Sequence, residues 1–145
     1  SKKRQNVNNH IRFFPLHHFF ITPLSLFFFV YTVIEFVSGG DDLLSRVATL
    51  ALGLVVLTVP LVARIYGTKN QDRIIRLEMR QRYYELTGKS FEEKERQLSK
   101  GQIIALRFAS NEELVQLVDQ AINEGLTAKS IKHEIKKWKA DHWRV

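Results

Sequence analysis

The sequence contains no cysteine, and no acidic residue precedes Glu35. A chain without cysteine does not rely on an oxidising compartment, although many exported proteins also lack cysteine. The sequence has no HExxH, P-loop, GxSxG or CxxC pattern either, and therefore no recognisable catalytic centre. We expect a protein that is not an enzyme, and we assign no catalytic residue, cofactor site or metal site.

Two long apolar runs lie near the N-terminus, from Leu16 to Val37 and from Val47 to Ala63. The hydrocarbon core of a bilayer is about 30 Å thick and is crossed by about 20 helical residues, and both runs are close to that length. Glu35 is the only formal charge in the first run, and the second run has none. The pattern predicts a transmembrane helical hairpin over residues 16–66.

Two other kinds of segment share some features of these runs. A buried hairpin of a soluble protein is also apolar, but the tail, residues 67–145, is too short to cover two helices that are apolar on nearly every face. A cleaved signal peptide also begins with basic residues, as residues 2–4 do here. The first run is longer than a signal core, and a second apolar run follows it, so we expect it to be retained.

The distribution of charge predicts the orientation of the hairpin. Cations precede the first run and follow the second: Lys2, Lys3, Arg4 and Arg12, then Arg64, Lys69, Arg73 and Arg76. The turn holds Glu35, Asp41 and Asp42 with only Arg46, and we interpret it as a solvated loop rather than a cation or proton site. The positive-inside rule places both the N-terminal basic segment, residues 1–15, and the tail in the cytoplasm.

Proline and small residues add detail to the two spans. Pro23 either kinks a full span, which we favour, or begins a shorter helix together with Thr22 after an interfacial segment. The 15 residues from Pro23 to Val37 would fall short of spanning the bilayer. In the second run, Thr49 and Gly53 form a small-xxx-small pair that would let the two helices approach closely.

The tail is predicted to be helical throughout, because no stretch alternates with period two over the length of a strand. Gly67 is expected to loosen its junction with the hairpin. The expected helices cover residues 70–86, 91–98, 102–109, 110–124 and 127–142, and glycines at 88 and 125 end the first and fourth. The predicted fold class is all-α, a transmembrane helical hairpin followed by a small cytoplasmic helical domain.

Local patterns in the tail predict its caps and its core. Two capping boxes are expected, at Ser90 with Glu93 and at Ser110 with Glu113. Apolar residues at helical spacing are expected to form the core: Ile75, Met79, Tyr83 and Leu86; Ile103, Ile104, Leu106 and Phe108; and Ile131, Ile135, Trp138 and His142. A domain of this size has a modest core, so we expect it to depend partly on the membrane, a partner or a second copy.

The chain is basic, with a formal net charge of +7 and a pI near 9.8. Much of the excess lies next to the hairpin, where each Lys or Arg near anionic lipid contributes about 1 kcal/mol. A nucleic-acid contact is less consistent with the tail, since twelve acids between Asp72 and Asp141 mix with its cations. Glu78 and Arg82, for example, are spaced for an exposed ion pair on one helix.

Four segments carry a resemblance that covers nearly the whole chain. They are Gln5 to Phe19, Asn70 to Glu78, Gln102 to Ser110 and the closing Trp138 to Val145. The chain resembles an uncharacterised bacterial family of small membrane proteins with two transmembrane helices and a helical cytoplasmic tail, a domain of unknown function. The resemblance implies a two-pass protein of the bacterial inner (cytoplasmic) membrane and carries over no activity, ligand or catalytic residue.

Histidine, aromatic and basic side chains are the expected contacts with lipid or with a partner. They are His10, Arg12, His17, His18, Phe19, Phe27, Phe28, Arg64, Arg73, Arg76, Arg107, Trp143 and Arg144. The Phe-rich first run offers more bulky apolar surface than one neighbouring helix can cover. We therefore expect a non-enzymatic inner-membrane protein, an accessory or scaffolding subunit that packs against a larger membrane protein complex. Its expected partners are membrane lipids and other integral membrane subunits, or itself.

Two alternatives remain open from the sequence. One is a self-associating membrane-anchored adaptor whose basic cytoplasmic helices bind nucleic acid, ribosome or anionic lipid. The other is a haem or metal carrier that uses interfacial histidines, with His17 joined by a tail histidine such as His133 or His142. Adjacent His17 and His18 diverge by about 100° on a helix and are poorly placed to bind one ion together. Solvation of lipid headgroups is the simpler role for these histidines.

Overall fold

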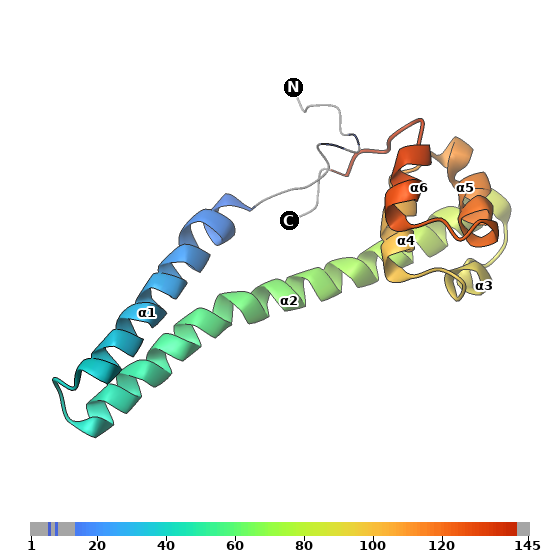
Figure 1. The fold of residues 1–145 in the computed structure, drawn as a ribbon. Helices are drawn as coiled ribbons and strands as arrows, with labels where there is room; N and C mark the ends of the chain where they lie inside the picture. Colours follow the sequence, from blue (N-terminus) through green and yellow to red (C-terminus); the bar gives the residue numbers. More distant parts are fainter. Residues whose placement is uncertain (1–5, 7, 9–13, 142–145) are drawn as a thin grey trace. The chain divides into compact units, whose positions relative to one another are not determined.

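The computed structural model describes residues 6, 8 and 14–141. These residues are largely helical and include no β-strand, so the prediction of an all-helical fold is confirmed. They divide into two compact units, which we name the hairpin unit, residues 14–68, and the tail unit, residues 69–141. Figure 1 labels the α-helices of both units.

The hairpin unit begins with a π-helical turn, η1 (Leu16–Ile21), that runs directly into α1 (Thr22–Ser38). The Thr22 hydroxyl donates a 2.8 Å hydrogen bond to the carbonyl oxygen of His17, and the Thr22 backbone N–H donates to the same oxygen. Pro23 has no N–H for the carbonyl four residues before it and its ring crowds that carbonyl, so a wider turn suits this position. The helical path is continuous from Leu16 to Ser38, as a full-length helix requires, although its α-helical part begins at Thr22.

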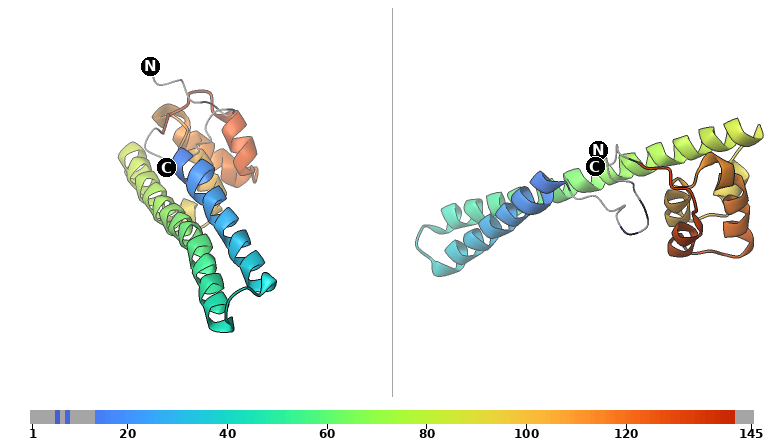
Figure 2. Two further views of the ribbon diagram at one scale, coloured as in Figure 1. Left: turned by 90° about the vertical axis from the view of Figure 1, so that its left-hand side faces the viewer. Right: turned by 90° about the horizontal axis from the view of Figure 1, so that it is seen from above.

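A short turn leads from α1 into α2 (Leu43–Thr87). Asp42 caps α2 by accepting hydrogen bonds from the backbone N–H of Ser45 at 3.0 Å and from the Ser45 hydroxyl at 2.7 Å. Arg46 donates a 2.9 Å hydrogen bond to the carbonyl oxygen of Phe36 near the end of α1. The two helices therefore lie side by side and run in opposite directions, as the views in Figures 1 and 2 show.

Among the glycines of the hairpin unit, Gly53 lies closest to the opposite helix. Gly53 is buried against Thr32 of α1, whose side chain is fully buried as well. A Cβ atom on Gly53 would lie 2.3 Å from the Thr32 hydroxyl oxygen and 2.9 Å from its methyl carbon. The Thr32 hydroxyl donates to the carbonyl oxygen of Phe29 at 2.7 Å, so no polar group is left unsatisfied at this contact. The expected close approach at Gly53 is confirmed.

The long helix α2 continues through both units for 45 residues. The separate helix predicted from residue 70 is therefore wrong, although the boundary between the two units, between Thr68 and Lys69, does fall close to Gly67. A helical glycine costs only about 1 kcal/mol relative to alanine, which is too little to end a helix whose next turns pack into a core. Gly88 does end α2: its φ is 69°, and its N–H donates to the carbonyl oxygen of Tyr84 at 2.7 Å.

The tail unit adds four short helices to the last part of α2. They are α3 (Glu92–Glu95), α4 (Lys100–Leu106), α5 (Asn111–Asn123) and α6 (Ala128–Glu134). Their buried apolar side chains form one core: Ile75, Met79, Tyr83, Phe91, Leu98, Ile103, Ala105, Leu106, Phe108, Ala109, Leu114, Leu117, Val118, Ala121, Ile131 and Ile135. The tail unit thus has a hydrophobic core that is independent of the apolar side chains of the hairpin.

Most residues that the sequence places in the core are buried there. Leu86 is an exception, since it lies at the end of α2 and is exposed, and Ile104 and Trp138 are only partly buried against the core. The predicted capping box of Ser110 and Glu113 is present at the start of α5. The α5 helix also ends before Gly125, whose φ is 62°.

The other predicted capping box, at Ser90, is wrong. The N-cap of α3 is Phe91, and Ser90 accepts a 3.3 Å hydrogen bond from the backbone N–H of Glu92 instead. Burial of the Phe91 ring in the core shifts the helix start by one residue, because the packing contributes more than a surface cap. A capping box that the sequence analysis did not predict, Ser99 with Gln102, opens α4.

The last predicted helix, residues 127–142, is too long. The observed helix, α6, ends at Glu134, and the segment that follows it pairs with the α4–α5 connection. The backbone N–H groups of Lys136 and Lys137 donate to the Glu113 carboxylate at 3.2 and 3.1 Å, and Lys139 N–H donates to the carbonyl oxygen of Phe108 at 2.7 Å. These tertiary hydrogen bonds use the same donors that a longer helix would need.

Candidate functional site

The hairpin unit presents an almost wholly apolar surface. Its helices are long and apolar enough to cross a membrane, and in their most apolar stretches only 11% and 6% of the residues are buried. Phe19 and Phe27 are 70% and 73% exposed. Phe28 is half-buried and stacks on Tyr31 with ring centroids 6.4 Å apart. Soluble proteins rarely expose apolar patches of this extent, so this surface is the strongest functional feature of the unit.

The histidines at the start of the hairpin unit contact each other. The rings of His17 and His18 meet edge to face with centroids 5.0 Å apart. The His18 Nδ1 atom lies 3.0 Å from the carbonyl oxygen of Phe14, so this nitrogen carries the proton and donates. Among residues 14–141, with 6 and 8, no three His, Asp or Glu side chains gather as a metal-binding group. His10, Arg12 and His142 lie outside the described residues.

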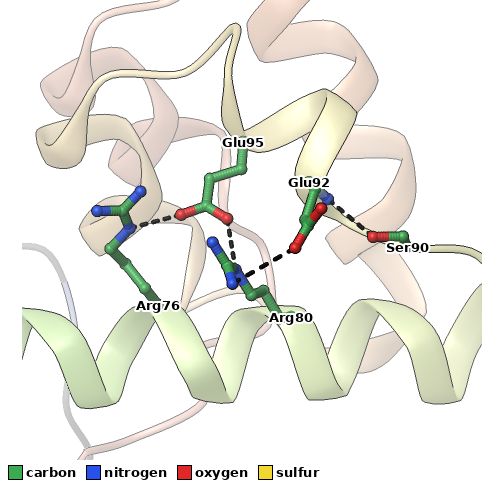
Figure 3. Close-up of polar contacts among 5 residues, drawn as sticks. All are labelled: Arg76, Arg80, Ser90, Glu92 and Glu95. Atoms are coloured by element: carbon green, nitrogen blue, oxygen red, sulfur yellow. Dashed lines mark hydrogen bonds and ion pairs between the residues drawn. The ribbon is translucent and has the colours of Figure 1, made fainter.

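In the tail unit, two arginines of α2 hold the buried carboxylate of Glu95, as Figure 3 shows. The Nε atom of Arg76 lies 2.5 Å from one Glu95 oxygen, and Nε of Arg80 lies 2.6 Å from the other. A second ion pair joins Arg80 to Glu92 at 3.6 Å. The Glu95 side chain is 4% exposed, while both arginines are about half exposed. This cluster fixes α3 against α2 and gives Arg76 a structural partner.

The electrostatics of Glu95 follow from its position. Burial alone would raise the pKa of Glu95, but the hydrogen bonds from Arg80 and Arg76 and their positive charges hold that pKa below its ordinary value. The same contact raises the pKa of Arg80. The carboxylate is therefore ionised at neutral pH, and the ion-pair cluster is a structural clamp rather than a proton donor.

We expect the Glu95→Gln substitution to destabilise the tail unit by about 1–2 kcal/mol at neutral pH, because it removes the charge that two arginines share. A pKa that is lowered in the folded state stabilises the protein above the ordinary pKa of glutamate. That stability is lost as the pH falls through the lowered value. Tryptophan fluorescence during denaturant unfolding of the detergent-solubilised chain would measure both effects.

The matched control for Glu95→Gln is Glu93→Gln, an exposed position on the same helix. We expect this control to change the free energy of unfolding by less than about 0.5 kcal/mol. The Glu95 variant should also lose less stability than the parent chain on acidification. Equal acid sensitivity of the parent chain and the Glu95 variant would contradict the proposed clamp.

The tail unit has a pocket of about 270 Å³ whose lining includes several charged side chains. It is lined by Glu78, Met79, Arg82, Arg107, Lys139, Ala140 and Asp141. Arg107 is buried and pairs with Asp141 at 3.0 Å. Burial and the nearby charge of Arg82 lower the pKa of Lys139, and burial lowers that of Arg82. Three cations against two acids give the pocket a modest positive charge and no nucleophile with an adjacent base.

Arg82 itself joins α2 to the connection between α4 and α5. It donates to the carbonyl oxygens of Arg107 at 3.0 Å and Ala109 at 2.8 Å, and to the side-chain oxygen of Asn111 at 2.8 Å. The sequence spacing predicts an exposed ion pair with Glu78, whereas the structure uses Arg82 as a half-buried hydrogen-bond donor. Carbonyl oxygens at the end of a short helix need donors, and helical spacing alone cannot reveal them.

The remaining predicted contact residues are dispersed. Arg64 is partly buried in the hairpin unit, and Arg73 is exposed on α2 in the tail unit. Trp143 and Arg144 lie outside the described residues. The sequence analysis missed Glu95, and it did not identify the roles of Arg82 and Lys139 in the pocket. A signal for Glu95 was present, because it lies in a charged segment whose neighbour Phe91 is a strong candidate for burial.

Comparison with known proteins gives a family and no activity. Residues 2–145 match the family described as Family of unknown function (DUF6526). The chain belongs to this family. No curated protein and no solved structure matches the sequence of this family member. The exposed apolar hairpin and the contacts of the tail unit are therefore the features that bear on its function.

Proposed function

We propose that this family member is a membrane-anchored accessory or scaffolding subunit of a larger membrane protein complex. The hairpin unit crosses the bilayer twice, and the tail unit is a cytoplasmic platform. The observation that carries the proposal is the exposure of most apolar side chains on α1 and on the first part of α2. Lipid tails or apolar helices of other subunits can cover such a surface without burying polar groups that lack hydrogen-bond partners.

The tail unit supports the same proposal because it has its own core. Its sixteen buried apolar residues come from residues 75–135 and include none from the hairpin unit. The apolar side chains of α1 and of residues 43–63 are therefore not needed to complete that core. A membrane environment is the simplest partner for them.

The charge of the tail unit disfavours the nucleic-acid alternative. Several of its lysines are neutralised by acids of the same unit: Lys94 pairs with Asp119 at 2.7 Å, Lys100 pairs with Asp72 at 2.9 Å, and Lys137 pairs with Glu112. A nucleic-acid surface needs a continuous field of one sign. The paired lysines make the surface mixed, which suits docking on protein better.

We expect the turn between α1 and α2 to face the outside of the cell and the tail unit to face the cytoplasm. The chain has no cysteine, so single substitutions such as Asp41→Cys and Lys89→Cys carry the only reactive thiol. A membrane-impermeant maleimide should label the Asp41→Cys chain in intact cells. It should label the Lys89→Cys chain only after permeabilisation, because the positive-inside rule keeps that end in the cytoplasm.

Alkaline extraction of the same membranes supplies the control for insertion. Both variants should stay in the membrane pellet, since two spans hold a protein in lipid under conditions that release peripheral proteins. Release of the chain into the supernatant would contradict the membrane hairpin. Labelling of the Lys89→Cys chain in intact cells would contradict the orientation. Co-purification of the pelleted chain with other integral subunits in mild detergent then tests the scaffolding role.

A further inference from the structure

A stripe of exposed side chains runs along α2 in the tail unit, on the face opposite the core. Ile74, Leu77 and Tyr84 are 58%, 63% and 62% exposed. Together with Asn70 and Gln81, which are also exposed, they follow one another at alternating intervals of four and three residues. That spacing places them on a single helix face, the a and d positions of two heptads. We name this set of five residues the outer stripe.

The buried side of the same helix has the complementary pattern. Ile75, Met79 and Tyr83 face the core and are at most 5% exposed. Each lies about 100° or more around the helix from the neighbouring members of the outer stripe. The outer stripe is thus a second apolar face of α2 that the described tail unit leaves uncovered.

The charges that flank the outer stripe have opposite signs on its two sides. Arg73 and Arg80 border one side, and Glu78 and Glu85 border the other. In heptad terms the arginines take g positions and the glutamates take e positions. In a parallel pair of helices, each g residue faces the e residue that follows it in the next heptad of the partner. Arg73 then faces Glu78 of a second copy.

An antiparallel pair would bring like charges together, because g positions face g positions and e positions face e positions. Arginine would meet arginine, and glutamate would meet glutamate, which destabilises the pair. Arg80 already binds Glu95 within its own chain, so the argument relies mainly on Arg73 and Glu78. The charge pattern selects a second copy of this chain in parallel orientation.

We propose that the outer stripe is a self-association surface on which two copies of this chain form a short parallel coiled coil. Two heptads are fewer than the roughly three or four that define an independent coiled coil. The proposed function supplies the remaining stabilisation, and the inference rests on it to this extent. A shared membrane holds both α2 helices in the same direction and raises their effective concentration.

Disulfide cross-linking in native membranes tests the surface directly, because the sequence has no cysteine of its own. Asn70→Cys and Gln81→Cys introduce a thiol in the outer stripe at polar positions, which spares its apolar residues. Lys69→Cys is the matched control, an exposed neighbour on another face of α2. Mild oxidation should convert most of each stripe variant into a disulfide-linked dimer and leave the control monomeric.

Charge reversal tests the orientation. In the Gln81→Cys chain, Arg73→Glu places a carboxylate opposite Glu78 of the second copy and should remove most of the cross-linked dimer. The double change Arg73→Glu with Glu78→Arg restores opposite charges and should restore the dimer to the starting level. An unspecific encounter in the membrane would not respond to reversal and rescue.

Several outcomes would overturn the proposal. They are no dimer from either stripe variant, equal cross-linking of Lys69→Cys, a cross-linked product that contains a different protein, and failure of the double reversal to restore the dimer. Alkaline extraction of the same samples reports membrane insertion separately. A chain that is extracted but still cross-links at the outer stripe would refute the proposed anchor and leave the dimer surface intact.

Discussion

The Gly53→Ala substitution is expected to destabilise the hairpin unit by about 2–3 kcal/mol, the upper part of the range for overpacking. The added Cβ atom would lie 2.3 Å from the Thr32 hydroxyl oxygen and 3.1 Å from the Thr32 Cβ atom. Thr32 is fully buried, so it has little room to move. Unfolding of the chain in mixed micelles, followed by helical circular dichroism, would measure the loss.

Gly67→Ala is the matched control in the same helix. A Cβ atom on Gly67 would have no neighbour within 4 Å, so alanine there should stabilise α2 by about 0.5–1 kcal/mol. Gly53→Ala with Thr32→Ala should recover part of the loss, because the hydroxyl and methyl groups of Thr32 are removed. Stabilisation by Gly53→Ala, as expected for Gly67→Ala, would show that α1 and α2 do not pack at Gly53.

Phe108→Ala is expected to cost the tail unit about 3–5 kcal/mol, the usual range for removal of a buried phenylalanine ring. Phe108 is 1% exposed, and its ring lies 4.8 Å from the ring of Trp138 and 4.6 Å from the guanidinium carbon of Arg107. The ring thus supports the segment that follows α6. Denaturant unfolding monitored by tryptophan fluorescence would report the loss, since Trp138 is one of two tryptophans in the chain.

Phe108→Leu should cost only about 1 kcal/mol, because it keeps most of the buried apolar volume. The exposed position Gln116 on α5 provides a second control, with Gln116→Ala expected to change stability by less than about 0.5 kcal/mol. A change in unfolding free energy below 1 kcal/mol for Phe108→Ala would be inconsistent with docking of the final segment on this ring.

Helix caps and glycine positions were predictable because they depend on local hydrogen bonds. The capping box of Ser110 and Glu113 and the helix ends at Gly88 and Gly125 involve groups within a few residues of each other. Ser90 is not the N-cap of α3, although it has the same Ser-x-x-Glu pattern as Ser110. The burial of Phe91, a tertiary effect, decided between two neighbouring starting points for α3.

The candidate site residues show the same division. Arg76 was predictable as a cation near the hairpin, but its partner Glu95 comes from a different helix. Glu113 was predictable as a cap of α5, and its carboxylate also binds the backbone of Lys136 and Lys137. Contacts between residues far apart in the sequence have no periodic pattern, so a single sequence does not reveal them.

The order of residues alone determined the helical class of this protein, its two long apolar helices and half of the sixteen members of the tail core. The length of an apolar run and the spacing of apolar residues along a helix are local properties, so they can be read directly from the sequence. Only the tertiary structure decided that α2 runs unbroken through Gly67 and that α6 stops at Glu134. The physical reason is competition: a weak local preference gives way wherever distant groups supply burial or hydrogen bonds of greater stabilising effect.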